Sequence, residues 1–510
     1  MSDKMITVKN ADREDEKTKW YVRPLVVLYL LGVMLVVVAI SLLFVIQESL
    51  RLDEAQSIWQ TSHSLSETLN IVANDVHVPL YHILLHYWMV IFGTGVETVR
   101  AMSLVFFLAS IPLMYILART ILGRGWSLTV VTLFALSPFM NWYANEARMY
   151  TLLAMFAILS QYFYIRILQG KAGWGGYALT VILGVYSHYF FLFTLMAQAI
   201  FYLFNRKKFP VGTLKKFIFT AVGVVLSLTP WILFFIKNGA ASNTRPLLQT
   251  PSTIDFFNTF SQFLFGFQSD AANTIILSSW PLMVIVAFFT VRKNLKITPT
   301  VAYIVVAAIV PVLLAFVLSF VVSPFFLSRY MVPAVAPLYI ATAWLLSQYS
   351  RKVAIVSVTI WLAIIGYTFY LQTVSPLNPV REDYQSAVTD IQRQATTSDV
   401  IALTAPFTVY PFEYYYTGNT KIETIPIWDR EADGAIPQFS TEELDQDVQK
   451  LITGHDYIYV LASHDQGYEK EVVDYFKNRY EQTQSKKYSE DMNLYVFRVG
   501  YDITPKIDQK

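Results

Sequence analysis

The residues best suited to chemistry are two adjacent carboxylates, Asp53 and Glu54, which stand shortly after the first long apolar run of the chain. Carboxylates are costly close to hydrocarbon, so an acidic pair where a helix leaves the membrane favours a functional role. A carboxylate in such a place can act as a general base that removes a proton from an acceptor hydroxyl. The alternative is that the pair only begins a solvated loop.

Further polar clusters stand at the ends of later apolar runs. They contain Asp75, His77 and Tyr81, then Glu146 and Arg148 in NWYANEARMY, His188 in YSHYFF, and Arg329 and Tyr330 in SRY. Counting the apolar runs from the first onward places every cluster on the same, outer, face of the membrane. Because the clusters converge on one face, we expect them to form one site.

Arg148 and Arg329 are the candidates for holding a phosphate. The planar guanidinium fork matches phosphate oxygens and keeps its charge near lipid. A held phosphate can leave as a nucleophile attacks the adjacent sugar carbon, while a carboxylate takes the proton of the nucleophile. Each arginine also has a plainer interpretation: Arg148 pairs with Glu146 at a helix cap, and Arg329 extends its charge from a span to the interface.

The composition defines the class of protein. The chain has 510 residues, of which 55% are hydrophobic and only 15% charged, as is typical of a polytopic membrane protein. The net charge of +2 argues against a nucleic-acid partner. The absence of cysteine excludes disulfides, thiolate metal sites and a cysteine nucleophile. The sequence also lacks a Ser-His-Asp signal and a Walker loop.

The apolar runs predict eleven membrane spans, with the amino terminus inside and the carboxyl terminus outside. The expected spans are 25–46, 98–120, 126–144, 149–168, two within 176–204, 217–236, 275–291, 300–321, 331–348 and 353–371. The first is interpreted as an uncleaved signal anchor, because no small-x-small cleavage site follows it. The stretch 205–216 holds five basic residues and no acid, so it belongs inside and requires two crossings within 176–204.

Between the spans, the stretch 237–273 is expected to be an outer loop, and the apolar helix 80–92 is too short to cross and should lie in the interface. His82 and His86 share one face of that helix and either bind a metal or form an interfacial polar stripe, of which the stripe is favoured. After the prolines Pro376 and Pro379 the composition becomes soluble in character. Short strands alternate there with helices, which predicts an α/β domain without a glycine-rich phosphate loop. The expected domains are a cytoplasmic tail, 1–24, a membrane domain, 25–375, and an extracytoplasmic domain, 376–510.

Five motifs in order then resemble the bacterial membrane glycosyltransferases of the GT-C superfamily, nearest to the family 39 group with its protein O-mannosyltransferases and aminoarabinose transferases. The motifs are LDEA, HVPLYHILLHYWMVIFG, VRAMS, LSPFMNWYANEARMYTLLAM and SRYMVPAVAPLYI. The resemblance runs from about residue 25 to 340, with Val78 in place of the first proline of the family's His-Pro-Pro-Leu-Tyr segment. It implies a GT-C-type helical membrane fold with interfacial helices in the first outer loop.

The resemblance also implies a polyprenyl-phosphate-linked sugar donor, an acceptor that is a lipid, a glycan or a protein, and transfer with inversion on the outer face of a bacterial inner membrane. Asp53 would be the general base and Glu54 a supporting or acceptor-binding carboxylate. Arg148 and Arg329 are assigned as the residues that bind the donor phosphate, because both are positively charged and both are expected on the outer face of the membrane. The substrate-binding candidates are Asp75, His77, Tyr81, Glu146, His188 and Tyr330. Some members of the superfamily use a divalent metal, but the acids here are few and we expect none, nor any other cofactor.

Two other classes of function remain as alternatives. One is a transporter or flippase for a lipid-linked saccharide, and the other is an inactive scaffold of a polysaccharide assembly complex. Transporters usually carry charges near the membrane midplane or show paired inverted repeats. The charges here gather at one face and no repeat is visible, which favours an enzyme over a transporter, and an intact Asp53 with outer-face arginines argues against a scaffold.

Overall fold

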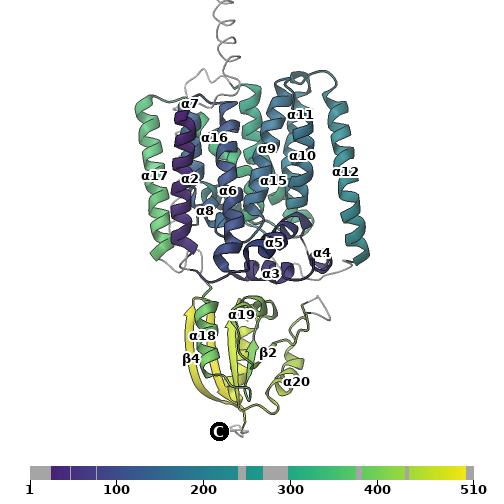
Figure 1. Ribbon diagram of the computed structural model, residues 1–510, viewed down its shortest axis with the longest axis vertical. Coiled ribbons are helices and arrows are strands. Elements are labelled where there is room, and N and C mark those ends of the chain that lie inside the picture. The colour runs from purple at the N-terminus through teal and green to yellow at the C-terminus, as the bar shows by residue number, and fades with distance from the viewer. Residues whose placement is uncertain are drawn as a thin grey trace, which may run out of the picture.

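The computed structural model describes residues 24–45, 48–75, 77–238, 249–267, 297–374, 382–430 and 436–500. An upright bundle of helices carries a small α/β body at one end (Figure 1). The amino-terminal tail before residue 24 and the span expected at 275–291 lie outside the described residues.

Helices account for nearly all of the bundle. In chain order they are α2 (Pro24–Val45), α6 (Val96–Arg119), α7 (Arg124–Ala135), α8 (Pro138–Ala144), α9 (Tyr150–Leu168), α10 (Trp174–Ser187), α11 (Phe191–Asn205), α12 (Thr213–Asn238), α13 (Thr253–Phe265), α15 (Pro299–Val321), α16 (Val335–Leu346) and α17 (Arg351–Val374). In the described part of the chain, 6 of these helices are long and apolar enough to cross a membrane. The mostly helical membrane fold is as predicted, and the number of crossings stays a prediction.

Two apolar stretches are each occupied by a pair of shorter helices, as expected for 176–204 but not for 126–144, where one span was expected. The stretch 176–204 holds most of α10 and α11, which are separated at His188 by an extended backbone with φ −166° and ψ 136°. The stretch 126–144 is likewise broken between α7 and α8, where Ser137 Oγ accepts a hydrogen bond from Met140 N over 3.2 Å and Pro138 begins the new helix.

The prediction of an outer loop over 237–273 is wrong where the structure describes it. Helix α12 continues to Asn238, and α13 follows at Thr253–Phe265. Ser252 and Asp255 form a capping box at the start of α13. Phe260 and Phe263 are buried in the core of the bundle. This aromatic packing stabilises a helix whose uncharged stretch is shorter than a membrane span.

Three short helices form the first loop after α2, namely α3 (Leu52–Thr61), α4 (Leu65–Asn74) and α5 (Pro79–Phe92). They lie along the end of the bundle that faces the α/β body (Figure 1). The longest, α5, has 14 residues and therefore spans about 21 Å, short of the roughly 30 Å hydrocarbon core. Helix α3 places Asp53 and Glu54 in its first turn.

The α/β body has a sheet with strand order β2-β1-β3-β5-β4. Its elements are α18 (Tyr384–Gln394), β1 (Val400–Leu403), α19 (Val409–Tyr415), β2 (Lys421–Thr424), α20 (Thr441–Ile452), β3 (Tyr457–Ser463), α21 (Glu469–Arg479), β4 (Glu481–Ser489) and β5 (Met492–Arg498). Strands β2, β1 and β3 are parallel, and β5 and β4 complete the sheet antiparallel. The alternation of strands and helices is as predicted, except that the polar edge strand β4 was not foreseen.

Candidate active site

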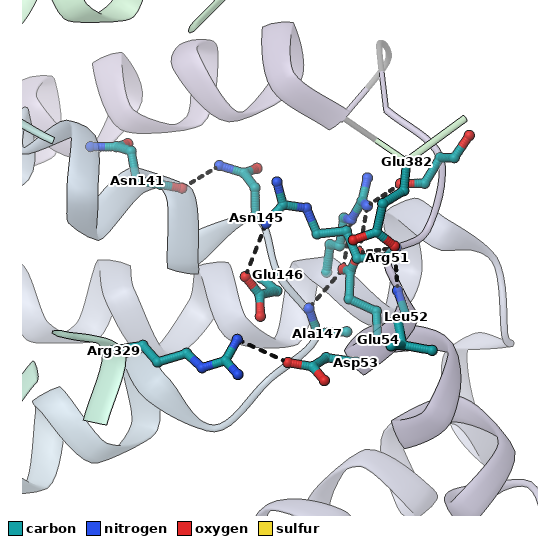
Figure 2. Close-up of polar contacts among 12 residues, drawn as sticks. Arg51, Leu52, Asp53, Glu54, Asn141, Asn145, Glu146, Ala147, Arg329 and Glu382 are labelled. Carbon is teal, nitrogen blue, oxygen red and sulfur yellow. Dashed lines mark hydrogen bonds and ion pairs between the residues drawn. The ribbon is translucent and has the colours of Figure 1, made fainter. Parts of the chain in front are cut away.

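Asp53 forms an ion pair with Arg329 at the end of the bundle. Asp53 Oδ2 accepts a hydrogen bond from Arg329 Nη1 over 3.2 Å (Figure 2). The arginine lies in the short 3-10 helix η2 (Ser328–Ala334) that leads into α16. The two side chains are 28% and 35% exposed, so a substrate can reach both. A carboxylate and a guanidinium are thus accessible together at one point.

Arg148 contacts the backbone of Asp53 and the side chain of Ser57. Its Nη1 donates to the backbone oxygen of Asp53 over 3.3 Å and to Ser57 Oγ over 3.0 Å, and its side chain is buried. Burial raises the pKa of Asp53, but Arg148 and then Arg329 outweigh it and lower the pKa to about 2. Asp53 is therefore ionised at any physiological pH, as a proton acceptor must be.

His77 accepts from the other end of the Arg148 guanidinium. Arg148 Nη2 lies 3.2 Å from His77 Nε2. Burial lowers the pKa of His77 to about 3, and Arg148 acts in the same direction, so the imidazole is neutral. Asp75 Oδ2 is 3.7 Å from the same nitrogen and accepts hydrogen bonds from Gln56 and Gln60 over 3.2 and 2.7 Å. Because the His77 ring is neutral, it does not form an ion pair with Asp75.

Glu54 has both oxygens occupied by donors from three segments. Arg100 on α6 donates from Nε to Oε1 over 2.8 Å and from Nη2 to Oε2 over 2.6 Å. Ala147 N donates to Oε1 over 2.9 Å, and Arg51 N donates to Oε2 over 3.0 Å (Figure 2). The side chain is fully buried, so Glu54 ties α3 to α6 and to the turn after α8. This arrangement favours the supporting role over direct acceptor binding.

Glu146 lines a small cleft at the start of α3. The other lining residues are Glu48, Arg51, Arg100, Trp142 and Asn145. Glu146 Oε2 is 3.6 Å from Arg51 Nη1, and the Arg51 guanidinium stacks 3.5 Å above the Trp142 ring. Burial raises the pKa of Glu146 to about 7, against the opposing charge of Arg51. Glu146 pairs with Arg51 and not with its sequence neighbour Arg148, contrary to the helix-cap alternative.

Aromatic rings lie beside Arg329. Tyr330 stacks on Phe190 at 4.6 Å and lies 5.4 Å from His188, and the Arg329 guanidinium is 5.6 Å from the Tyr330 ring. His188 is buried, with Nδ1 accepting from Phe190 N over 3.1 Å. Tyr330 and His188 therefore belong to one wall of the site.

Tyr81 is placed differently from the other candidates. It is fully buried, and its hydroxyl lies 3.3 Å from Ser103 Oγ, which donates in turn to the backbone oxygen of Arg148 over 3.1 Å. Tyr81 therefore supports Arg148 from behind and has no surface for a substrate. Arg51, Ser57 and Arg100 were missed as site residues, although Arg100 stands in the VRAMS motif.

A divalent metal, which some members of the superfamily use, does not fit the surroundings of Asp53. Two guanidinium groups already neutralise this carboxylate and would repel a cation. Within the described residues, no group of three or more His, Asp or Glu side chains is arranged to hold a metal ion.

The comparisons with known proteins agree with the helical membrane fold that the sequence motifs predicted. The structure is similar to that of ArnT from Cupriavidus metallidurans in the apo state, with a TM-score of 0.59 and 14% sequence identity over 92% of this chain and 97% of that one. The structure of the same protein bound to undecaprenyl phosphate gives a TM-score of 0.58 and 12% sequence identity over 93% of this chain and 98% of that one. At such identities the likeness establishes the fold alone.

A family model described as dolichyl-phosphate-mannose-protein mannosyltransferase matches residues 76–234. The match includes His77, Glu146, Arg148 and His188, whereas Asp53 and Arg329 lie outside it. No curated protein matches the chain significantly in sequence.

Proposed function

We propose that the protein is an integral-membrane glycosyltransferase that moves a sugar from a polyprenyl-phosphate donor to an acceptor hydroxyl or amine on the extracytoplasmic face. Asp53 is the general base, and Arg329 and Arg148 hold the donor phosphate. The observation that carries the proposal is the partly exposed, ionised Asp53 paired with Arg329 at 3.2 Å. The similar ArnT structure with undecaprenyl phosphate supports a lipid-phosphate ligand.

The proposed reaction is a single displacement. The acceptor O–H or N–H gives its proton to Asp53 while its oxygen or nitrogen forms a bond to the anomeric carbon. The bond between that carbon and the phosphate oxygen breaks, and the polyprenyl phosphate leaves with the electron pair. Attack opposite the leaving group inverts the configuration. The guanidinium groups stabilise the negative charge that grows on the phosphate.

The ion pair with Arg329 makes deprotonation of the acceptor depend on donor binding. With a pKa of about 2, Asp53 is a weak base while Arg329 is paired with it. A donor phosphate would draw the Arg329 guanidinium away, which removes a neighbouring positive charge and raises the pKa of the carboxylate. Asp53 would then become a stronger base only when the donor is bound, so the acceptor is deprotonated only when there is a sugar to receive it.

The membrane orientation follows from the same proposal. The basic stretch 205–216 is inside, so the end of the bundle that carries α3 and the α/β body is outside. The clustering of charged side chains at that end supports an enzyme acting at the surface over a transporter with midplane charges. The bacterial inner membrane is the proposed location.

The deciding experiment measures transfer from a panel of radiolabelled polyprenyl-phosphate sugars into a membrane extract, comparing wild type with Asp53→Asn. Loss of the base should lower turnover by about 10²–10⁴-fold. Donor binding should remain, because both guanidinium groups are still present. Asp255→Asn, at an exposed position in the first turn of α13, is the matched control and should behave as wild type, because asparagine keeps a side-chain oxygen for the helix cap. Near-normal turnover by Asp53→Asn would mean that another group is the base, and no transfer by wild type from any donor would favour the transporter or scaffold.

A further inference from the structure

The amino end of α3 is capped by a residue of the α/β body. Glu382 Oε2 accepts a hydrogen bond from Leu52 N over 2.9 Å (Figure 2). The first N–H groups of a helix have no partner within it, and a carboxylate at this end also interacts favourably with the helix dipole. Leu52 immediately precedes Asp53, so Glu382 fixes the backbone from which the proposed base extends.

His464 holds Glu382 in this position. His464 Nε2 lies 3.3 Å from Glu382 Oε2, the same oxygen that accepts from Leu52 N. Burial lowers the pKa of His464, but Glu382, with Asp491 and Asp53 farther away, raises it above its ordinary value. Three carboxylates from separate segments therefore favour an imidazolium here.

The backbone of His464 is unusual. It directly follows β3 and has a φ of 53°, a left-handed conformation that costs a non-glycine residue about 1–2 kcal/mol. The ring lies between Tyr384, at 6.5 Å, and Phe407, at 6.1 Å, which hold it toward Glu382. A strained residue that aims a charged ring at the cap of α3 indicates that the contact matters for function.

A second set of contacts attaches the outer face of α3 to the same body. Trp59 packs against Tyr410 of α19 at 5.0 Å, and the Arg430 guanidinium lies 5.1 Å from the Trp59 ring. Ala55 is buried in the core of the α/β body, together with Tyr384. Helix α3 is therefore shared: Glu54 binds it to the bundle, and Ala55 and Trp59 bind it to the α/β body.

We propose that the α/β body is a positioning part of the active site, in which Glu382 and His464 hold the first turn of α3 so that Asp53 faces Arg329. Both are positioning residues, since neither contacts the reacting atoms. This inference rests on the proposed function, because it assigns a task to the assembly around the proposed base. It gives the carboxyl-terminal domain a role in turnover that does not require it to bind any substrate.

The test compares Glu382→Gln, Glu382→Ala and His464→Asn in the full-length protein. Glutamine keeps an acceptor for Leu52 N but loses the ion pair, alanine loses both, and asparagine tolerates the left-handed backbone while removing the ring. A misplacement of about 1 Å can cost on the order of 10²-fold in rate, so we expect kcat to fall by about 10- to 100-fold with Glu382→Ala and less with Glu382→Gln. The KM for donor should stay near its wild-type value, because Arg148 and Arg329 are unchanged.

Hydrogen exchange of the peptide around α3 provides a readout that does not depend on activity. We expect severalfold faster exchange of the first-turn amides in Glu382→Ala and His464→Asn, and wild-type exchange in His455→Asn, a control on the far side of the same body near Ser398. Wild-type kcat together with wild-type exchange in Glu382→Ala and in His464→Asn would overturn the inference. If Glu382→Ala fails to fold, Glu382→Gln decides. Normal turnover by Asp53→Asn would overturn the proposed base instead, and the exchange data would still report on the docking.

Discussion

Arg148 donates from Nη2 to Nε2 of His77 over 3.2 Å, a hydrogen bond that only a neutral imidazole can accept. The low pKa of His77, about 3, keeps the ring in that form. The partnership holds one end of a buried guanidinium whose other end contacts Ser57 and the backbone of Asp53. His77 thus acts on the proposed phosphate site through Arg148, and a contact of the ring with substrate is not needed to explain its place.

Substitution of His77 tests this relationship. His77→Gln retains an acceptor for Arg148 and should raise the KM for donor only a few fold. His77→Phe leaves a buried guanidinium N–H without a partner, which costs about 1–3 kcal/mol and should raise KM by about tenfold or more. Steady-state kinetics with a fixed acceptor measures both. Equal KM values for the two variants would show that the acceptor function of His77 is unimportant.

Arg329→Lys should impair donor binding even though the charge is kept. A lysine cannot form two parallel hydrogen bonds to a phosphate, and losing a hydrogen bond to a charged group costs about 1.5–3 kcal/mol, or roughly 10- to 100-fold in affinity. Titration with a non-transferable polyprenyl phosphate measures the change. Arg393→Lys, at an arginine that is 74% exposed on α18, is the control. Unchanged affinity in Arg329→Lys would remove this residue from the donor site.

Glu54→Gln should lower the free energy of unfolding more than it impairs the transfer reaction itself. The substitution leaves Arg100 as an unpaired buried charge, and breaking such a pair typically costs about 3–5 kcal/mol. Thermal unfolding of the purified protein should reveal a clear loss, whereas Glu490→Gln, in an exposed pair with Lys487, should cost less than about 1 kcal/mol. A stable Glu54→Gln protein without turnover would instead place Glu54 among the catalytic groups.

Glu146 predicts a stability that depends on pH. Its pKa is raised to about 7 from an ordinary 4.5, so between these values the folded protein keeps a proton that the unfolded chain has lost. Stability from this group is therefore full below pH 4.5 and declines as the pH rises to 7. Glu146→Gln removes the effect, so its melting temperature relative to wild type should increase between pH 5 and pH 8. A constant difference, like that expected of the exposed Glu471→Gln, would contradict the raised pKa.

Local pattern carried most of the fold prediction. Long apolar runs specified most of the membrane helices between α2 and α17, and the basic stretch before α12 supported two helices in 176–204. Helix α13 was not predicted, because its apolar face is short and is interrupted by polar residues. Strand β4 escaped because it lies at the sheet edge, where EQTQSKKYS has no buried face to impose alternation.

The residues of the candidate site could be predicted from the sequence better than the contacts between them. Acidic and basic residues at helix ends could be singled out one by one, yet no periodicity links Asp53 to Arg329 across 276 positions. Nor does any local signal connect Leu52 to Glu382, or Glu54 to Arg100, since these pairs arise only when separate helices pack. Sequence neighbours misled in one case, because Glu146 turns away from Arg148 toward Arg51.

The two outer strands of the sheet restrict how an acceptor can be recognised. Strand β4 forms one edge and carries Lys486 and Lys487, while β2 forms the other and has only 4 residues. Lysines and short strands are the usual means by which proteins prevent another chain from extending a sheet. A polypeptide acceptor would therefore find little backbone to pair with on this body. Recognition of such an acceptor would have to depend on its side chains, because both edges of the sheet are protected against pairing with extended segments of other proteins.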